Sequence, residues 1–83
     1  MTSRTLDLRG LKCPLPVLRT RKALAQMGAG AEIRVTSTDP MSAIDIPHMC
    51  HEDGHALLSS ERIDERTLEF VIRARSGEPT GKA

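Results

Sequence analysis

Two proline-containing helix starts constrain how this chain can fold. Cys13-Pro14 and Asp39-Pro40 each follow a short segment of alternating apolar residues and precede a helical pattern. Proline is favoured in the first turn of a helix, and the residue before it is held in an extended conformation. The pattern predicts strands at residues 5–9, 32–37, 56–63 and 67–75, and helices at residues 14–27 and 41–52.

Glycine and proline also mark where the predicted elements end. The first helix is expected to stop at Gly28-Ala29-Gly30, and the second at Gly54. Pro47 lies inside the second helical segment and is expected to interrupt or kink it.

The element order βαβαββ and the short chain together predict the architecture. With 83 residues the chain makes one domain, which is too small to cover both faces of a sheet. We expect a two-layer α/β (α+β) sandwich, with a four-stranded mixed sheet and two helices packed on one face. The domain should span residues 1–75, and the polar residues 76–83 should form a disordered tail.

The predicted first helix carries two stripes of residues at helical spacing. The stripe that should face the core contains Val17, Thr20, Leu24 and Met27. The other contains Leu15, Leu18, Lys22 and Ala25, with Arg21 between the two stripes. Leu15, Leu18, Arg21 and Lys22 are therefore predicted to bind an acidic partner protein. Boundary packing of Leu18 is an equally good interpretation.

Charge and composition exclude several classes of function. The net charge is +1 and the only aromatic residue is Phe70, so the chain lacks the basic field and stacking surfaces of a nucleic-acid-binding protein. No apolar run is long enough to span a membrane, and the N-terminal residues do not resemble a signal peptide. We therefore expect a cytoplasmic protein with reduced cysteines.

Cys13 is the strongest candidate for chemistry. It should cap the helix that starts at Pro14, where the helix dipole and the nearby cations Lys12 and Arg9 would favour a thiolate. Gly10, Pro14 and Pro16 should shape and stiffen the backbone around Cys13, although each proline removes a backbone hydrogen-bond donor. Asp39 is interpreted as a helix cap, and Asp45 as a solvated or local acceptor.

A second group of polar side chains leaves an alternative open. His48, Cys50, His51 and His55 lie close together in the sequence and could form a metal-binding module. Their spacing fits known zinc patterns poorly, so surface histidines with an inward-packed Cys50 are preferred and no metal is predicted. A regulatory interaction domain with an incidental cysteine is a further alternative.

The sequence resembles the TusA/SirA family of sulfur carriers over residues 6–75. The matching motifs are Gly10-Leu11, Cys13-Pro14-Leu15-Pro16-Val17, Arg21-Lys22, Asp39-Pro40, Asp45-Ile46-Pro47, Cys50 and Phe70-Val71-Ile72. The family fold is a βαβαββ sandwich, which agrees with the pattern of the elements. Leu15 stands where some members that act in tRNA thiolation have an acidic residue.

This resemblance implies a sulfurtransferase that acts as a protein sulfur carrier and needs no cofactor. Cys13 would accept sulfane sulfur as a persulfide from a cysteine desulfurase or rhodanese. It would pass the sulfur to a downstream relay protein, in tRNA 2-thiouridine synthesis or another sulfur-trafficking pathway.

Overall fold

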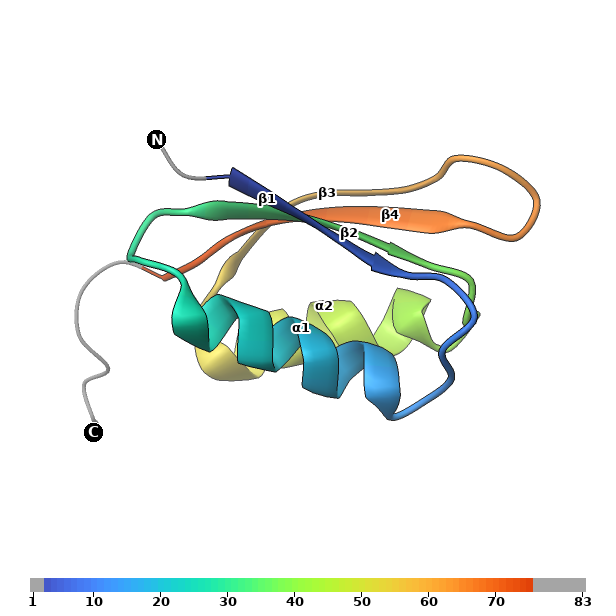
Figure 1. The fold of residues 1–83 in the computed structure, drawn as a ribbon, viewed down its shortest axis with the longest axis horizontal. Helices are drawn as coiled ribbons and strands as arrows, with labels where there is room; N and C mark the ends of the chain where they lie inside the picture. Colours follow the sequence, from blue (N-terminus) through green and yellow to red (C-terminus); the bar gives the residue numbers. More distant parts are fainter. Residues whose placement is uncertain (1–2, 76–83) are drawn as a thin grey trace.

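The computed structural model describes residues 3–75 and shows one sheet with two helices on one of its faces (Figure 1). The elements are β1 (Ser3–Leu8), α1 (Leu15–Gln26), β2 (Glu32–Ser37), α2 (Ser42–Asp53), β3 (Ala56–Arg62) and β4 (Leu68–Arg73). The predicted fold class, a two-layer βαβαββ sandwich, is confirmed.

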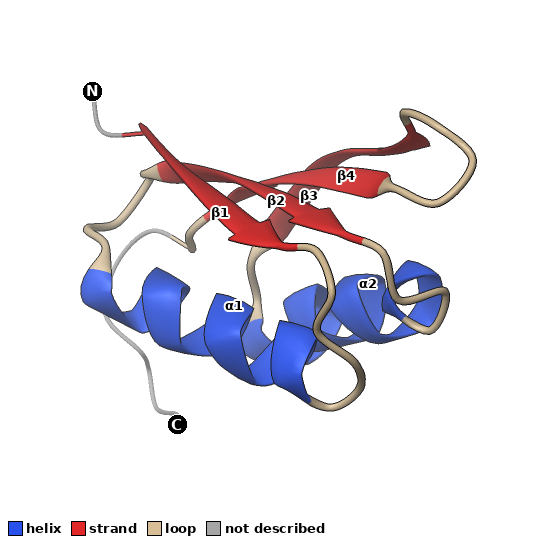
Figure 2. Cartoon of the chain, turned by 45° about the vertical axis from the view of Figure 1, so that its right-hand side comes forward, coloured by secondary structure: helices blue, strands red, loops and turns tan. Residues whose placement is uncertain are grey.

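The sheet is mixed and has the strand order β1-β2-β4-β3. β1 and β2 are parallel, so Leu8 and Ser37 lie side by side where both strands end. β4 runs antiparallel to β2 and to β3, with a register shift between Leu57 and Ser59. The loops that follow β1 and β2 therefore start at the same end of the sheet (Figure 2).

The core lies between the sheet and the two helices. Its buried members are Leu8, Ala23, Leu24, Ile33, Val35, Ile46, Met49, Cys50, Phe70, Ile72 and Ala74. Thr20 is also buried, and Val17 and Met27 pack against the core from its edge. The predicted inner stripe of the first helix is thus confirmed, with Pro16 and Ala23 added to it.

The uncovered face of the sheet is polar. Arg34 on β2 pairs with Glu69 on β4 at 2.8 Å, and Arg73 pairs with Glu32 at 3.1 Å. These cross-strand ion pairs suit a face that meets solvent, so a single layer of helices is enough to bury the apolar side chains.

The predicted start of the first helix is wrong, and the interruption expected at Pro47 does not occur. α1 begins at Leu15, one residue later than expected, and Pro14 occupies the cap position. α2 continues through Pro47 without a break. The carbonyl group that loses its donor there belongs to Ala43, an exposed residue, so that carbonyl can face water.

Some expectations lie outside the described residues. The predicted tail, residues 76–83, is one of them. Within residues 3–75, neither helix has the length and apolar character needed to cross a membrane.

Candidate functional site

Cys13 lies in the loop between β1 and α1, at the end of the sheet where the parallel strands finish. Its side chain is exposed to solvent. The loop turns at Gly10, whose φ of +88° is a left-handed conformation that other residues rarely adopt. The Cys13–Pro14 peptide bond is cis.

Two residues that follow β2 hold this loop. The hydroxyl oxygen of Thr38 accepts a hydrogen bond from the Gly10 N–H at 2.8 Å. Asp39 Oδ2 accepts one from the Cys13 N–H at 2.6 Å. The other carboxylate oxygen, Oδ1, accepts the Met41 N–H at 3.0 Å, next to the start of α2. The prediction that Asp39 caps the second helix is wrong, because the cap residue of α2 is Met41. The Asp39 carboxylate instead joins the Cys13 loop to the turn that precedes α2.

Cys13 does not cap α1 as predicted. The cap residue is Pro14, and no side chain hydrogen-bonds there. The Leu15 N–H donates to the carbonyl oxygen of Lys12 at 2.8 Å, and Pro16 has no N–H to offer. The start of α1 therefore presents few free donors, and the helix dipole is a weak source of stabilisation for a thiolate.

The charges around the Cys13 thiol also differ from expectation. Interaction with the nearby Asp45 carboxylate is the main cause that raises the pKa of Cys13, and partial desolvation and the charge of Asp39 raise the pKa further. Both aspartates disfavour a negative thiolate beside them. The free protein therefore holds Cys13 as a thiol more firmly than its sequence neighbours suggested.

Arg9 does not supply the positive charge that its position in the sequence suggested. It forms an ion pair with Asp7 at 2.9 Å, and this contact lowers the pKa of Asp7 to about 2. Lys12 is exposed beside Cys13, as the sequence indicated.

The predicted partner residues separate into two groups. Leu15 and Leu18 are 41% and 51% exposed, which favours a surface role over boundary packing for Leu18. Lys22 is exposed on the same helix. Sequence patterns did not single out Met41 and Ile44, which are 47% and 63% exposed at the start of α2.

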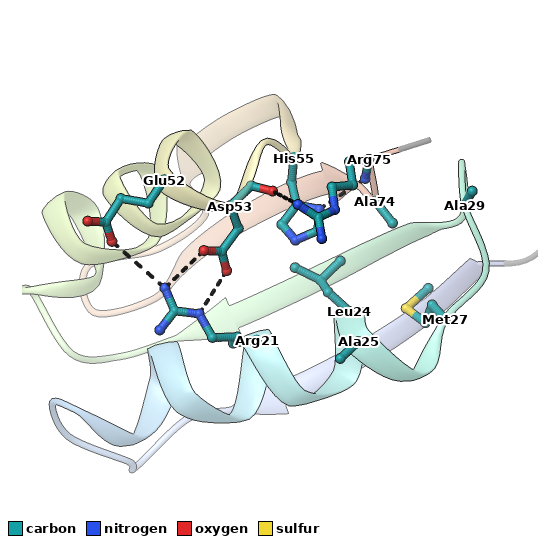
Figure 3. Close-up of a pocket in the computed structure, with 10 residues that line it drawn as sticks. All are labelled: Arg21, Leu24, Ala25, Met27, Ala29, Glu52, Asp53, His55, Ala74 and Arg75. Carbon is teal, nitrogen blue, oxygen red and sulfur yellow. Dashed lines mark hydrogen bonds and ion pairs between the residues drawn. The ribbon is translucent and has the colours of Figure 1, made fainter. Parts of the chain in front are cut away.

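Arg21 lies in a different environment. Its guanidinium contacts Asp53 at 2.7 Å and Glu52 at 3.8 Å, both at the C-terminal end of α2 (Figure 3). These residues line a groove of about 540 Å³ that also includes Leu24 and His55. Cys13 is not among the residues that line this groove. The contact of Arg21 with a partner stays a prediction.

The residues of the alternative metal site do not converge. Cys50 is buried at 2% exposure, and burial raises its pKa to about 11. His48 contacts Glu52 at 3.3 Å, and His55 Nδ1 accepts the backbone N–H of Arg75 at 3.0 Å. Within the part of the chain that the structure describes, no three His, Cys, Asp or Glu side chains form a group that could hold a metal ion.

The fold and the site together define a small domain that presents one exposed thiol. Comparison with known proteins places it further: the family model for sulfurtransferase TusA matches residues 4–74. The chain belongs to the TusA sulfurtransferase family.

Relatives of known sequence and structure agree with this assignment. A candidate sulfur carrier protein of Neisseria meningitidis serogroup A is 48% identical over 64 residues, which cover 77% of this chain and 86% of that protein. One from Aquifex aeolicus is 41% identical over 71 residues, covering 86% of this chain but only 36% of the relative.

One solved structure is similar to this chain over most of the length of both proteins. The crystal structure of a SirA-like protein from Desulfitobacterium hafniense has a TM-score of 0.78 and 31% identity, and the match covers 88% of this chain and 99% of that one. Membership of the family supports a general role in sulfur relay, which requires partner proteins.

Proposed function

We propose that Cys13 accepts sulfane sulfur as a persulfide and relays it to another protein. The observation that carries the proposal is an exposed thiol, in a Cys-Pro-Leu-Pro segment, on a loop fixed by two side-chain hydrogen bonds. The sulfurtransferase family of the chain supports the same conclusion.

The chemistry is an exchange between sulfur atoms. The Cys13 thiol loses its proton, and the thiolate attacks the outer sulfur of a persulfide on the donor. A new S–S bond forms at Cys13, the donor's S–S bond breaks, and the donor cysteine leaves as a thiolate that takes up a proton. The second transfer repeats this exchange, with the acceptor thiolate attacking the outer sulfur on Cys13. Neither transfer needs an external oxidant or reductant.

The proposed partners follow from this chemistry. A cysteine desulfurase or rhodanese would act as donor, and a downstream relay protein would act as acceptor, in the cytoplasm. Synthesis of tRNA 2-thiouridine is one destination, and another sulfur-trafficking pathway is the alternative. A cofactor is not needed for the exchange, and the protein would work as a carrier between larger proteins.

Intact mass measurement tests the proposal. The purified protein is incubated with a cysteine desulfurase and L-cysteine, and in a second arm with a rhodanese and thiosulfate. We expect a mass increase of one sulfur atom that disappears in Cys13→Ser and persists in Cys50→Ser. A wild-type protein that gains no sulfur from either donor, or an undiminished gain in Cys13→Ser, would refute the proposal.

A further inference from the structure

We propose that Asp39 is the positioning residue for Cys13: its carboxylate fixes the sulfur-bearing loop to the start of α2, and rapid exchange with a partner depends on this link. The inference rests on the proposed function, because it concerns the same thiol. Asp39 lies 26 residues away in sequence and reaches Cys13 only through the fold.

The loop is anchored at two places: Leu11 packs against the core, and side chains beyond β2 accept hydrogen bonds from its backbone. Residues 9–14 contain no helix or strand. Two described hydrogen bonds join the loop to the segment between β2 and α2, from Gly10 to Thr38 and from Cys13 to Asp39. Only the second acts at the residue that carries the thiol.

Asp39 is itself held firmly. Its N–H donates to the Ser37 hydroxyl oxygen at 3.2 Å, and its carbonyl oxygen accepts the Ser42 N–H at 2.9 Å. The hydroxyl groups of Ser37 and Ser42 are buried and lie 2.7 Å apart. A hydrogen-bonded pair inside the domain thus sets the position of the Asp39 backbone, and through its side chain that of Cys13.

The geometry requires a carboxylate. The two oxygens of Asp39 accept from two different backbone donors, Cys13 on one side and Met41 on the other. An amide has one acceptor oxygen and one donor nitrogen, so asparagine cannot satisfy both N–H groups. Serine can replace the bond to Met41, because its hydroxyl group can form the same local turn, but its shorter side chain does not reach Cys13.

A fixed sulfur position matters for this reaction. The attacking sulfur must align with the S–S bond of the partner, and small displacements of a reacting group reduce rates strongly. Loss of the Asp39 link should therefore slow transfer between proteins by about tenfold, while a small reagent still reaches the exposed thiol.

The test compares Asp39→Ser with Asp39→Ala. Both lose the bond to Cys13, but only alanine also loses the bond to Met41. We expect both variants to accept sulfur from a cysteine desulfurase with L-cysteine about tenfold more slowly than wild type, with only Asp39→Ala showing a clearly lower urea midpoint. If Asp39 merely stabilised the fold, the transfer rates would follow the urea midpoints instead.

Two control variants separate the effect of the position of Cys13 from the effect of the negative charge near its thiol. Asp45→Asn removes a negative charge near Cys13 but keeps the Asp39 link, so it should transfer faster than Asp39→Ser. Asp64→Asn makes the same chemical change in the turn between β3 and β4. There Oδ1 alone accepts the N–H groups of Arg66 and Thr67, and asparagine keeps that oxygen, so transfer should equal wild type.

Iodoacetamide and amide exchange complete the test. In Asp39→Ser we expect alkylation of Cys13 to be at least as fast as in wild type, and exchange of its amide proton to be faster. A wild-type transfer rate in Asp39→Ser would overturn the inference while leaving the carrier function intact. If the wild type accepts no sulfur, the proposed function fails, and unchanged amide exchange in Asp39→Ser would separately overturn the positioning role.

Discussion

The pKa values of both cysteines are raised in the folded protein, but for different physical reasons. Cys13 is exposed and its pKa is raised mainly by the nearby Asp45 carboxylate, whereas Cys50 is buried and desolvation raises its pKa to about 11. A partner's cation can neutralise a carboxylate and so remove the first effect. The second effect persists as long as the core stays folded. Only Cys13 can therefore change its reactivity on contact with another protein.

The largest expected difference between the two thiols is their reactivity in the native state. With iodoacetamide at neutral pH, Cys13 should react on the order of a thousandfold faster than Cys50, because Cys50 must first become exposed by unfolding. Mass spectrometry of peptides over a time course measures both rates. Comparable labelling rates of the two cysteines in folded protein would contradict this prediction. Labelling in urea is the control, because both thiols are exposed in the unfolded chain.

Replacing Cys50 should affect stability and not sulfur acceptance. Cys50→Ala removes a buried atom from the core and should lower the free energy of unfolding by about 1–2 kcal/mol. Cys50→Ser places a hydroxyl in the same apolar site and should cost at least as much. Urea unfolding gives the stability, and the sulfur mass gain should stay at the wild-type level in both variants. A lost mass gain in a folded Cys50 variant would assign this residue a part in the chemistry.

The stability contribution of Cys50 should also depend on pH. Its pKa is higher in the folded state than in the unfolded chain, so the folded state binds the proton more tightly. The resulting stabilisation is present below the ordinary pKa of a cysteine and is lost as the pH rises through about 11. Unfolding in urea between neutral and alkaline pH should show this loss in wild type and not in Cys50→Ala. Parallel curves for the two proteins would contradict it.

Asp45→Asn tests the cause of the raised pKa at Cys13. Removing the carboxylate removes the largest reason for that rise, so the pH profile of Cys13 alkylation should move to lower pH. Cys50 should keep its own profile, because Asp45 is not among the causes of its pKa. An unchanged Cys13 profile would mean that Asp45 does not control the thiol in solution.

The sequence predicted the fold well because its signals are local. Alternation predicted β2 at residues 32–37 as observed, and the helical stripe predicted that Thr20 and Leu24 are buried. The left-handed cap at Gly54 ends α2 where a glycine was expected to end it. Each of these depends on residues a few positions apart, which a linear pattern records.

The electrostatics of the site could not be predicted in this way. Lys12 and Arg9 are the nearest cations in sequence and suggested a stabilised thiolate, but Arg9 pairs with Asp7. The groups that act on Cys13 come from beyond β2, since Asp39 and Asp45 approach it only when the parallel strands align. The shared Asp-Pro and Asp-Ile-Pro motifs indicated that these positions matter, but a helix-cap role was a sufficient explanation for Asp39.

The smallest expected effect concerns the docking surface, and it separates partner contact from thiol chemistry. Lys22→Glu should slow sulfur acceptance from a protein donor about threefold, because a charge at the rim of an interface mainly changes the association rate. The free energy of unfolding of this variant should equal that of the wild type, since Lys22 has no ion pair among residues 3–75. Alkylation of both cysteines by iodoacetamide should stay at the wild-type rate.

Arg21→Glu makes the same charge reversal at a residue bound to Asp53, so it should also cost up to about 1 kcal/mol of stability. The two substitutions therefore distinguish a charge that a partner meets from one that joins the two helices. If transfer with Lys22→Glu equals wild type while Arg21→Glu slows it, the docking surface lies toward the groove between the helices. If neither changes transfer, the partner contacts Cys13 without using the basic residues of α1.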